Sequence, residues 1–191
     1  MMKVISEAKG KYLILLFAVY QLLGTYCSRQ LYPDASFINV KSQAEKNKLK
    51  EFLEEGTEKV INIRNASPDE IIGTARKYLG VPHCMGGKTM KCIDCSGLLV
   101  AVFGKYGVNL PHNSEAQARY GKIIRNISDL KKGDLVFFIR SYKTNNFITH
   151  SGIYIGDNKF IHTSSSVGVT TTPMSDPYWN EKFLFGTRVF D

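Results

Sequence analysis

The chain has few of the residues that build metal fingers. Its 191 residues include four cysteines, four histidines and one tryptophan. Cys92 and Cys95 form a C-x-x-C pair, but a zinc finger needs a second pair or histidines at finger spacing, and the sequence has neither. A thioredoxin-like redox pair would follow a βαβ pattern, whereas a glycine-rich loop precedes this one. The sequence therefore argues against a metal site and against a thioredoxin-like activity.

A concentrated basic stripe is also missing. The formal net charge is +8, from 25 Lys and Arg against 17 Asp and Glu, but the basic residues are spread along the chain. Nucleic-acid binders gather Lys and Arg in one stripe with interleaved aromatic residues. We therefore expect no nucleic-acid partner. An anionic polymer of the cell envelope or a membrane surface fits the mild basicity better.

Apolar segments long enough to span a bilayer comfortably are missing as well. Residues 12–23 are apolar with one exception, follow three lysines and are short for a span. Residues 1–27 are therefore predicted to be a secretory signal. Cys27 lies just after the apolar run, which favours a lipoprotein signal whose acylated first residue is Cys27. Tyr26 is large for such a cleavage site, so ordinary cleavage and an uncleaved anchor stay open.

The remainder divides into a polar segment and one folded domain. Residues 28–66 are rich in Lys and Glu, and a stretch at 44–60 has apolar residues at helical spacing. We expect a linker here, with a short amphipathic helix that is either solvated or laid against the domain. The domain is predicted to cover residues 67–191, which are enough for one hydrophobic core.

Three helices are predicted ahead of the strands. The first begins at Ser67, which with Glu70 forms a capping box, and it runs to Gly80. The second begins at Asp94 and is closed by Gly107. A third follows Pro111, where Ser114 and Gln117 fit another capping box.

Strand patterns take over from Gly133 onward. Gly156, Asp157 and Asn158 have hairpin chemistry between two of the strands. Helices followed by consecutive strands predict an α+β fold with an antiparallel sheet. The predicted strands are 134–140, 151–155, 159–163, 168–172 and 185–190.

Cys95 is the candidate nucleophile. It stands at the start of the second helix, and a helix N-terminus favours a thiolate and offers free N–H groups to an oxyanion. Cys84 and Cys92 are either a disulfide pair, which would leave Cys95 free, or small buried residues in a loop. His150 and His162 lie on the two strands of the predicted hairpin, so they can be neighbours. One can then hold the thiolate as an ion pair while the other orients it.

Several motifs together resemble the NlpC-type cell-wall cysteine peptidases, a papain-like family. The resemblance covers nearly all of residues 67–191, and the tail from Ser164 to Trp179 resembles the lipoprotein murein endopeptidase branch of that family. The motifs are Leu79-Gly80-Val81-Pro82 with Gly86-Gly87, Ile93-Asp94-Cys95-Ser96-Gly97-Leu98, Leu110-Pro111 with Gln117, Leu130 to Phe138, His150 to Gly156, and Phe160-Ile161-His162.

The resemblance implies an exported peptidoglycan hydrolase, a cysteine endopeptidase that cuts peptide bonds in stem peptides or cross-links. Cys95 would be the nucleophile, His150 the base and His162 the residue that orients it, with the Cys95 N–H in the oxyanion hole. Asp94 and Ser96 would line the substrate pocket. No metal or organic cofactor is implied. The expected location is the cell envelope, as a periplasmic lipoprotein anchored to a membrane.

The chain also departs from the family pattern. His83 stands where relatives have a tyrosine beside the nucleophile, so we expect His83 to bind substrate with an altered pH dependence. His112 and Asn113 replace an arginine and a hydroxyl residue. An alternative function is therefore a catalytically inactive, envelope-binding or peptidoglycan-binding module on the same fold, in which Cys92 could trap Cys95 in a disulfide.

Overall fold

The computed structural model describes residues 37–63 and 66–190, so the predicted secretory signal and Cys27 lie outside the described residues. No helix in this part of the chain is both long and apolar enough to cross a membrane. Phe37 to Asp191 form one compact unit.

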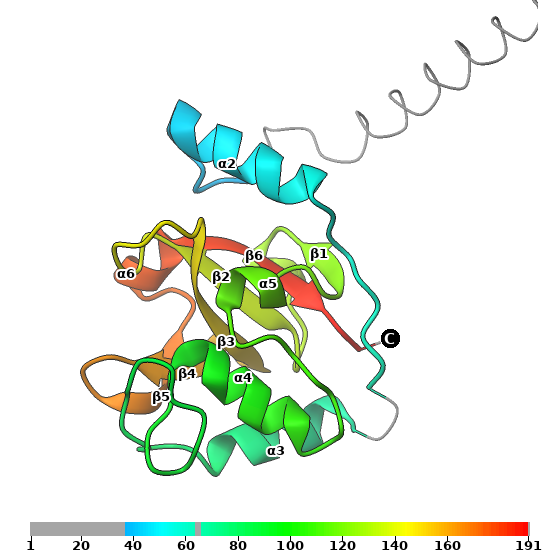
Figure 1. The fold of residues 1–191 in the computed structure, drawn as a ribbon, viewed down its shortest axis with the longest axis vertical. Coiled ribbons are helices and arrows are strands. Elements are labelled where there is room, and N and C mark those ends of the chain that lie inside the picture. Colours follow the sequence, from blue (N-terminus) through cyan, green and yellow to red (C-terminus); the bar gives the residue numbers. More distant parts are fainter. Residues whose placement is uncertain (1–36, 64–65, 191) are drawn as a thin grey trace, which may run out of the picture. The chain divides into compact units, whose positions relative to one another are not determined.

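A six-stranded antiparallel sheet with the order β1-β6-β2-β3-β4-β5 forms the centre of this unit (Figure 1). The predicted α+β class is confirmed. All five predicted strands are present with bounds shifted by a few residues, and one short strand, β1, had no sequence signal. The strands are β1 Lys122–Ile124, β2 Leu135–Ile139, β3 Ile148–Gly156, β4 Lys159–Ser164, β5 Gly168–Pro173 and β6 Phe183–Arg188.

The turn between β3 and β4 is the predicted hairpin. Asp157 and Asn158 have φ values of 49° and 55°, the left-handed pair that a type I′ turn requires. The ladder pairs Ile153 with Ile161, which brings the ends of both strands that carry histidines together.

Helix α4, Cys95–Gly104, packs against β3 and β4. Its sequence is apolar almost all round, as expected of a helix buried on several sides. The side chains of Leu98, Leu99, Val102 and Phe103 are completely buried. This burial fixes the helix axis, and with it the position of Cys95 at the first turn.

Helix α3, Pro68–Arg76, begins as predicted, with the Ser67 hydroxyl accepting from the Glu70 N–H and the Glu70 carboxylate accepting from the Ser67 N–H. It ends at Arg76, before Gly80, and Leu79 is half exposed. Helix α5, Ser114–Gln117, is present, but the predicted capping box is wrong. Asn113 is the N-cap, because its side chain accepts from the Ala116 N–H.

Helix α2, Gln43–Glu54, lies within the segment predicted as a linker and is packed against the domain. Leu49 and Phe52 are buried, and the Phe52 ring lies 6.0 Å from that of Phe185 on β6. The compact unit therefore begins well before the predicted domain start at Ser67. The remaining helix, α6, spans Pro177–Asn180, and a 3₁₀ turn, η2, spans Ile127–Asp129.

Candidate active site

Cys95 is the first residue of α4, as predicted from the sequence. Asp94 is the N-cap, and its Oδ1 accepts from the Gly97 N–H at 2.6 Å. Gly97 is needed because a Cβ there would overlap the Gly87 carbonyl oxygen. The helix start is thus pressed against the loop that precedes it, and the Cys95 N–H makes no bond within the helix.

The Asp94 carboxylate joins four groups around the start of α4. In addition to Gly97, Oδ1 accepts from the Ser96 hydroxyl at 3.0 Å and lies 3.0 Å from His112 Nε2, while Oδ2 accepts from the Gly86 N–H at 2.7 Å. Asp94 and Ser96 are both buried, and both line the cleft described below. Much of their bonding capacity is used to hold the loop and helix together.

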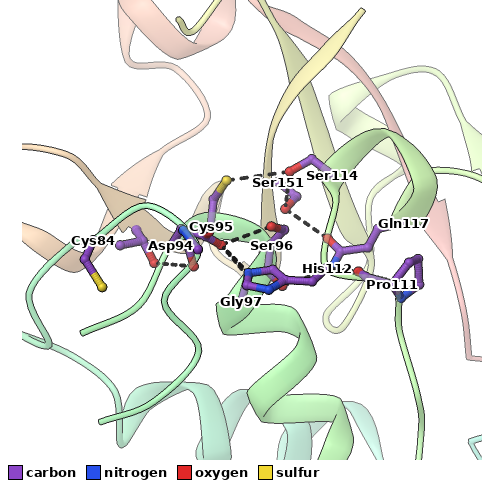
Figure 2. Close-up of polar contacts among 12 residues, drawn as sticks. Cys84, Asp94, Cys95, Ser96, Gly97, Pro111, His112, Ser114, Gln117 and Ser151 are labelled. Atoms are coloured by element: carbon purple, nitrogen blue, oxygen red, sulfur yellow. Dashed lines mark hydrogen bonds and ion pairs between the residues drawn. The ribbon is translucent and has the colours of Figure 1, made fainter. Parts of the chain in front are cut away.

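A chain of side-chain hydrogen bonds leads away from the Cys95 sulfur (Figure 2). The Ser114 hydroxyl lies 3.6 Å from Sγ and 3.1 Å from the Ser151 hydroxyl on β3. Ser151 in turn donates to Gln117 Oε1 at 3.2 Å. Ser151 and Gln117 are completely buried, so this chain is shielded from solvent.

The two predicted histidines are in direct contact. His150 Nε2 and His162 Nδ1 are 2.9 Å apart, and His162 Nε2 lies 2.9 Å from Thr172 Oγ1 on β5. Both imidazoles are buried. Trp179 of α6 covers them, with its ring centroid 4.5 Å from that of His150 and 4.7 Å from that of His162.

Cys95 and His150 open into one cleft of about 690 Å³. His83, Asp94, Ser96 and Trp179 also line it, so the structure brings together all but one of the candidate site residues that lie in its described part. The exception is His162, which lies behind His150 and does not line the cleft. No hydrogen bond joins Cys95 to His150 among the described residues.

Burial shifts the pKa values of Cys95 and His150. It raises the pKa of the Cys95 thiol, against the lowering effect of hydrogen bonds from Ser114 and from the Ser151 backbone. Burial, with His162 and His83 nearby, holds the pKa of His150 well below its usual value, and burial lowers that of His162 to about 4. Burial therefore favours the neutral forms of the thiol and of both imidazoles, and it opposes the ion pair expected from the sequence.

The neighbouring cysteines are paired with each other. Cys84 and Cys92 form a disulfide, and Cys95 is free. The bridge closes the loop that carries Gly86 to the cleft, and His83 lies directly before it. Of the two interpretations that the sequence left open, the disulfide is the correct one.

Sequence reasoning missed several residues of the site. Ser114 and Gln117 were predicted to form a helix cap. Their side chains instead belong to the hydrogen-bond chain that starts at the Cys95 sulfur. Thr172 and Ser151 carry no local signal. The pairing of β4 with β5 brings Thr172 to His162, and the packing of α5 on β3 brings Ser151 to Ser114. For Trp179 the sequence allowed two interpretations, a residue of a packed loop or part of the wall of a substrate site. The structure shows both features, because its ring packs on His150 and it lines the cleft.

A partly buried thiol at the start of a helix, beside a histidine pair in a cleft, is the arrangement expected of a cysteine hydrolase. The model of the NlpC/P60 family matches residues 80–188, and the chain belongs to that family of cysteine peptidases. The helices α2 and α3 precede the matched region.

Relatives and solved structures agree with this assignment. The chain is 41% identical over 113 residues to murein DD-endopeptidase MepS/murein LD-carboxypeptidase of Escherichia coli, covering 59% of this chain and 57% of that one. It is 41% identical over 123 residues to the gamma-DL-glutamyl hydrolase of Bacillus subtilis, covering 63% of this chain but only 29% of the relative. The crystal structure of an NlpC/P60 family protein from Bacillus cereus matches with a TM-score of 0.61 and 28% identity, over 68% of this chain and 42% of that one.

Proposed function

We propose that the protein is an exported cysteine endopeptidase that hydrolyses peptide bonds in the stem peptides or cross-links of peptidoglycan. The observation that carries this proposal is that Cys95 and His150 line one cleft, with His162 hydrogen-bonded to His150 on the side away from the cleft. The names of the relatives, murein DD-endopeptidase and gamma-DL-glutamyl hydrolase, support the substrate class.

In the proposed reaction, Cys95 Sγ attacks the scissile carbonyl carbon while the thiol proton passes to His150 Nδ1. The carbonyl oxygen becomes an oxyanion, which the free N–H of Cys95 at the α4 terminus stabilises. His150 then gives the proton to the leaving amine, and a water molecule hydrolyses the thioester with His150 again as base. Burial opposes both the thiolate and the imidazolium, which favours transfer of the proton during the attack itself.

His162 orients the base in this scheme. His150 Nδ1 must be free of hydrogen in order to accept a proton, so the neutral ring carries its hydrogen on Nε2. That Nε2–H donates to His162 Nδ1 at 2.9 Å. The second imidazole therefore selects the reactive tautomer of the first.

Asp94, Ser96 and His83 remain the proposed substrate-binding residues. The Ser96 hydroxyl already donates to the Asp94 carboxylate, so these two would present an ordered polar wall to the substrate rather than flexible side chains. His83 lines the same cleft as these two residues. An imidazole there is shorter than the tyrosine of relatives, and it would offer ring nitrogens rather than a phenol to the substrate.

The proposed location is the cell envelope. In this proposal residues 1–27 direct export, residues 67–191 carry the catalytic site and Cys27 is the lipid anchor. The test is fractionation after a Cys27→Ala change, which we expect to release the protein into the soluble envelope fraction. Unchanged membrane association would instead indicate an uncleaved anchor.

The competing function is an inactive binding module. One reason for it is removed, since Cys92 is paired with Cys84 and cannot trap Cys95. Mass spectrometry of products from purified peptidoglycan separates the two functions. We expect new muropeptides with the unaltered protein and none with Cys95→Ala. Loss of cross-linked dimers would establish cross-link cleavage, shortened stems would establish cleavage within one stem, and no Cys95-dependent product would favour the binding module.

A further inference from the structure

The buried amide of Gln117 fixes the direction of the hydrogen-bond chain that ends at the catalytic sulfur. Its Nε2 donates to the Ser96 and Pro111 carbonyl oxygens, at 2.9 and 2.8 Å. Both amide hydrogens are thereby used, and Oε1 can only accept. The single hydroxyl proton of Ser151 is therefore donated to Gln117 (Figure 2).

Ser114 is left with one proton and two acceptors. The Ser151 hydroxyl donates its hydrogen to Gln117, so its oxygen accepts from the Ser114 hydroxyl at 3.1 Å. The Cys95 sulfur lies 3.6 Å from the Ser114 oxygen. While Cys95 is a thiol, its S–H can donate to the Ser114 oxygen, and the Ser114 proton turns to Ser151. Once Cys95 is a thiolate, the sulfur becomes the stronger acceptor.

We propose that Ser114 is a further catalytic residue, whose hydroxyl proton turns from Ser151 to the Cys95 sulfur as the thiol loses its proton to His150. No covalent bond of Ser114 breaks in this step, because the hydroxyl hydrogen only turns about the Cβ–Oγ bond. Gln117 and Ser151 hold the hydroxyl in place and are positioning residues. Their burial keeps water from replacing the hydroxyl as a partner of the sulfur.

The surroundings of the sulfur explain why a switching donor is useful there. Burial and the Asp94 carboxylate both oppose the thiolate, and the Tyr142 hydroxyl, whose pKa is raised by burial and by Cys95 and Asp94, is neutral. The imidazoles that line the cleft are His83, His112 and His150. A donor that acts only on the ionised sulfur stabilises the state that attacks the substrate, and leaves the resting thiol intact.

The test is the pKa of the Cys95 thiol, from the rate of alkylation by iodoacetamide between pH 6 and 10, approximately the range that brackets a free thiol. Peptide mass spectrometry reads alkylation at Cys95 separately from Cys27. The variants are Ser114→Ala, Ser114→Thr and Ser151→Ala in the full chain. Ser128→Ala is the matched control, because Ser128 is exposed and contacts Asp129 rather than the site.

We expect Ser114→Ala to raise the thiol pKa by about one unit, which slows alkylation at pH 7 about tenfold. Ser114→Thr keeps the hydroxyl and should restore the rate to within about twofold. Ser151→Ala should leave the pKa unchanged or lower it, because the Ser114 proton then has no second acceptor. This opposite direction distinguishes a switching hydroxyl from a general loss of packing.

Two results would overturn the proposal. One is a Ser114→Ala variant with the thiol pKa of the Ser128→Ala control, and the other is a Ser151→Ala variant whose pKa rises as far as that of Ser114→Ala. The catalytic part of the inference rests on the proposed endopeptidase function. The thiol measurement needs no peptide substrate, so it can fail while peptidoglycan is still cleaved, or succeed while no Cys95-dependent product forms.

Discussion

His162 Nε2 lies 2.9 Å from the hydroxyl oxygen of Thr172 on the neighbouring strand β5. The contact completes a line of three groups, from His150 through His162 to Thr172. If His162 donates its Nε2 hydrogen to Thr172, its Nδ1 is free to accept from His150. In that arrangement the Thr172 hydroxyl selects the tautomers of both imidazoles.

Replacement of Thr172 by valine should lower kcat about tenfold with little change in KM, because the hydroxyl touches His162 rather than the cleft. Valine keeps the branched shape and removes only the acceptor. Thr172→Ser should restore most of kcat, and Thr171→Val, at the exposed neighbouring position, should have no effect. Steady-state kinetics on purified muropeptides provide the measurement. Equal kcat for Thr172→Val and Thr171→Val would refute the role of the hydroxyl.

The buried histidines should make the protein less stable in mild acid. The pKa of His162 falls from 6.5 in the unfolded chain to about 4 in the folded one, and that of His150 falls in the same direction. Between these values the unfolded state binds more protons. The free energy of unfolding therefore keeps its full value above pH 6.5 and decreases as the pH falls toward 4.

For His162 alone the loss should be on the order of 3 kcal/mol in the free energy of unfolding. Urea unfolding at a series of pH values measures it. Carboxylates also titrate in this range, so the comparison is with His162→Gln, which keeps a polar side chain but does not titrate. The pH dependence of the variant should be shallower than that of the unaltered protein, and parallel curves would contradict the depressed pKa.

The parts of the site that depend on local sequence were predictable. Asp94 ahead of an apolar run gave the helix start and the position of Cys95. The turn at Gly156 to Asn158 placed His150 and His162 on paired strands. These features follow from capping and turn chemistry, which act over a few residues.

The parts of the fold and site that depend on tertiary contacts could not be predicted from the sequence. Ser114 and Gln117 have the spacing of a capping box, and that local explanation hid their approach to Ser151, 37 and 34 residues away in the sequence. Strand β1 has three residues and exists because β6 provides its partner. The docking of α2 rests on a few apolar side chains whose partner, Phe185, lies at the other end of the chain.

Loss of the Cys84–Cys92 disulfide should lower both stability and activity. The bridge closes a loop with a sequence separation of 8, for which loop-closure entropy gives about 2 to 3 kcal/mol. This loop also supplies the Gly86 N–H that donates to Asp94, and it begins directly after His83. A Cys84→Ser, Cys92→Ser variant should unfold at a lower temperature, and its KM should rise more than its kcat falls. An unchanged KM would show that the loop keeps its place without the bridge.

Helix α2 should unfold together with the peptidase domain, although it lies outside the part of the chain that matches the family. The Phe52 ring is buried against Phe185, and the Arg119 guanidinium lies 4.4 Å above it. Phe52→Ala should therefore cost about 3 kcal/mol in the free energy of unfolding. Leu53→Ala, at the partly exposed next position, should cost much less.

Urea unfolding followed by far-ultraviolet circular dichroism and by the fluorescence of Trp179 measures both variants. The Trp179 ring packs on His150 and His162, so its fluorescence reports on the cleft rather than on α2. If α2 belongs to the folding unit, Phe52→Ala moves both transitions by the same amount and they stay coincident. A Trp179 transition that stays in place while helical signal is lost earlier would show that α2 unfolds independently, and would return the domain boundary to Ser67.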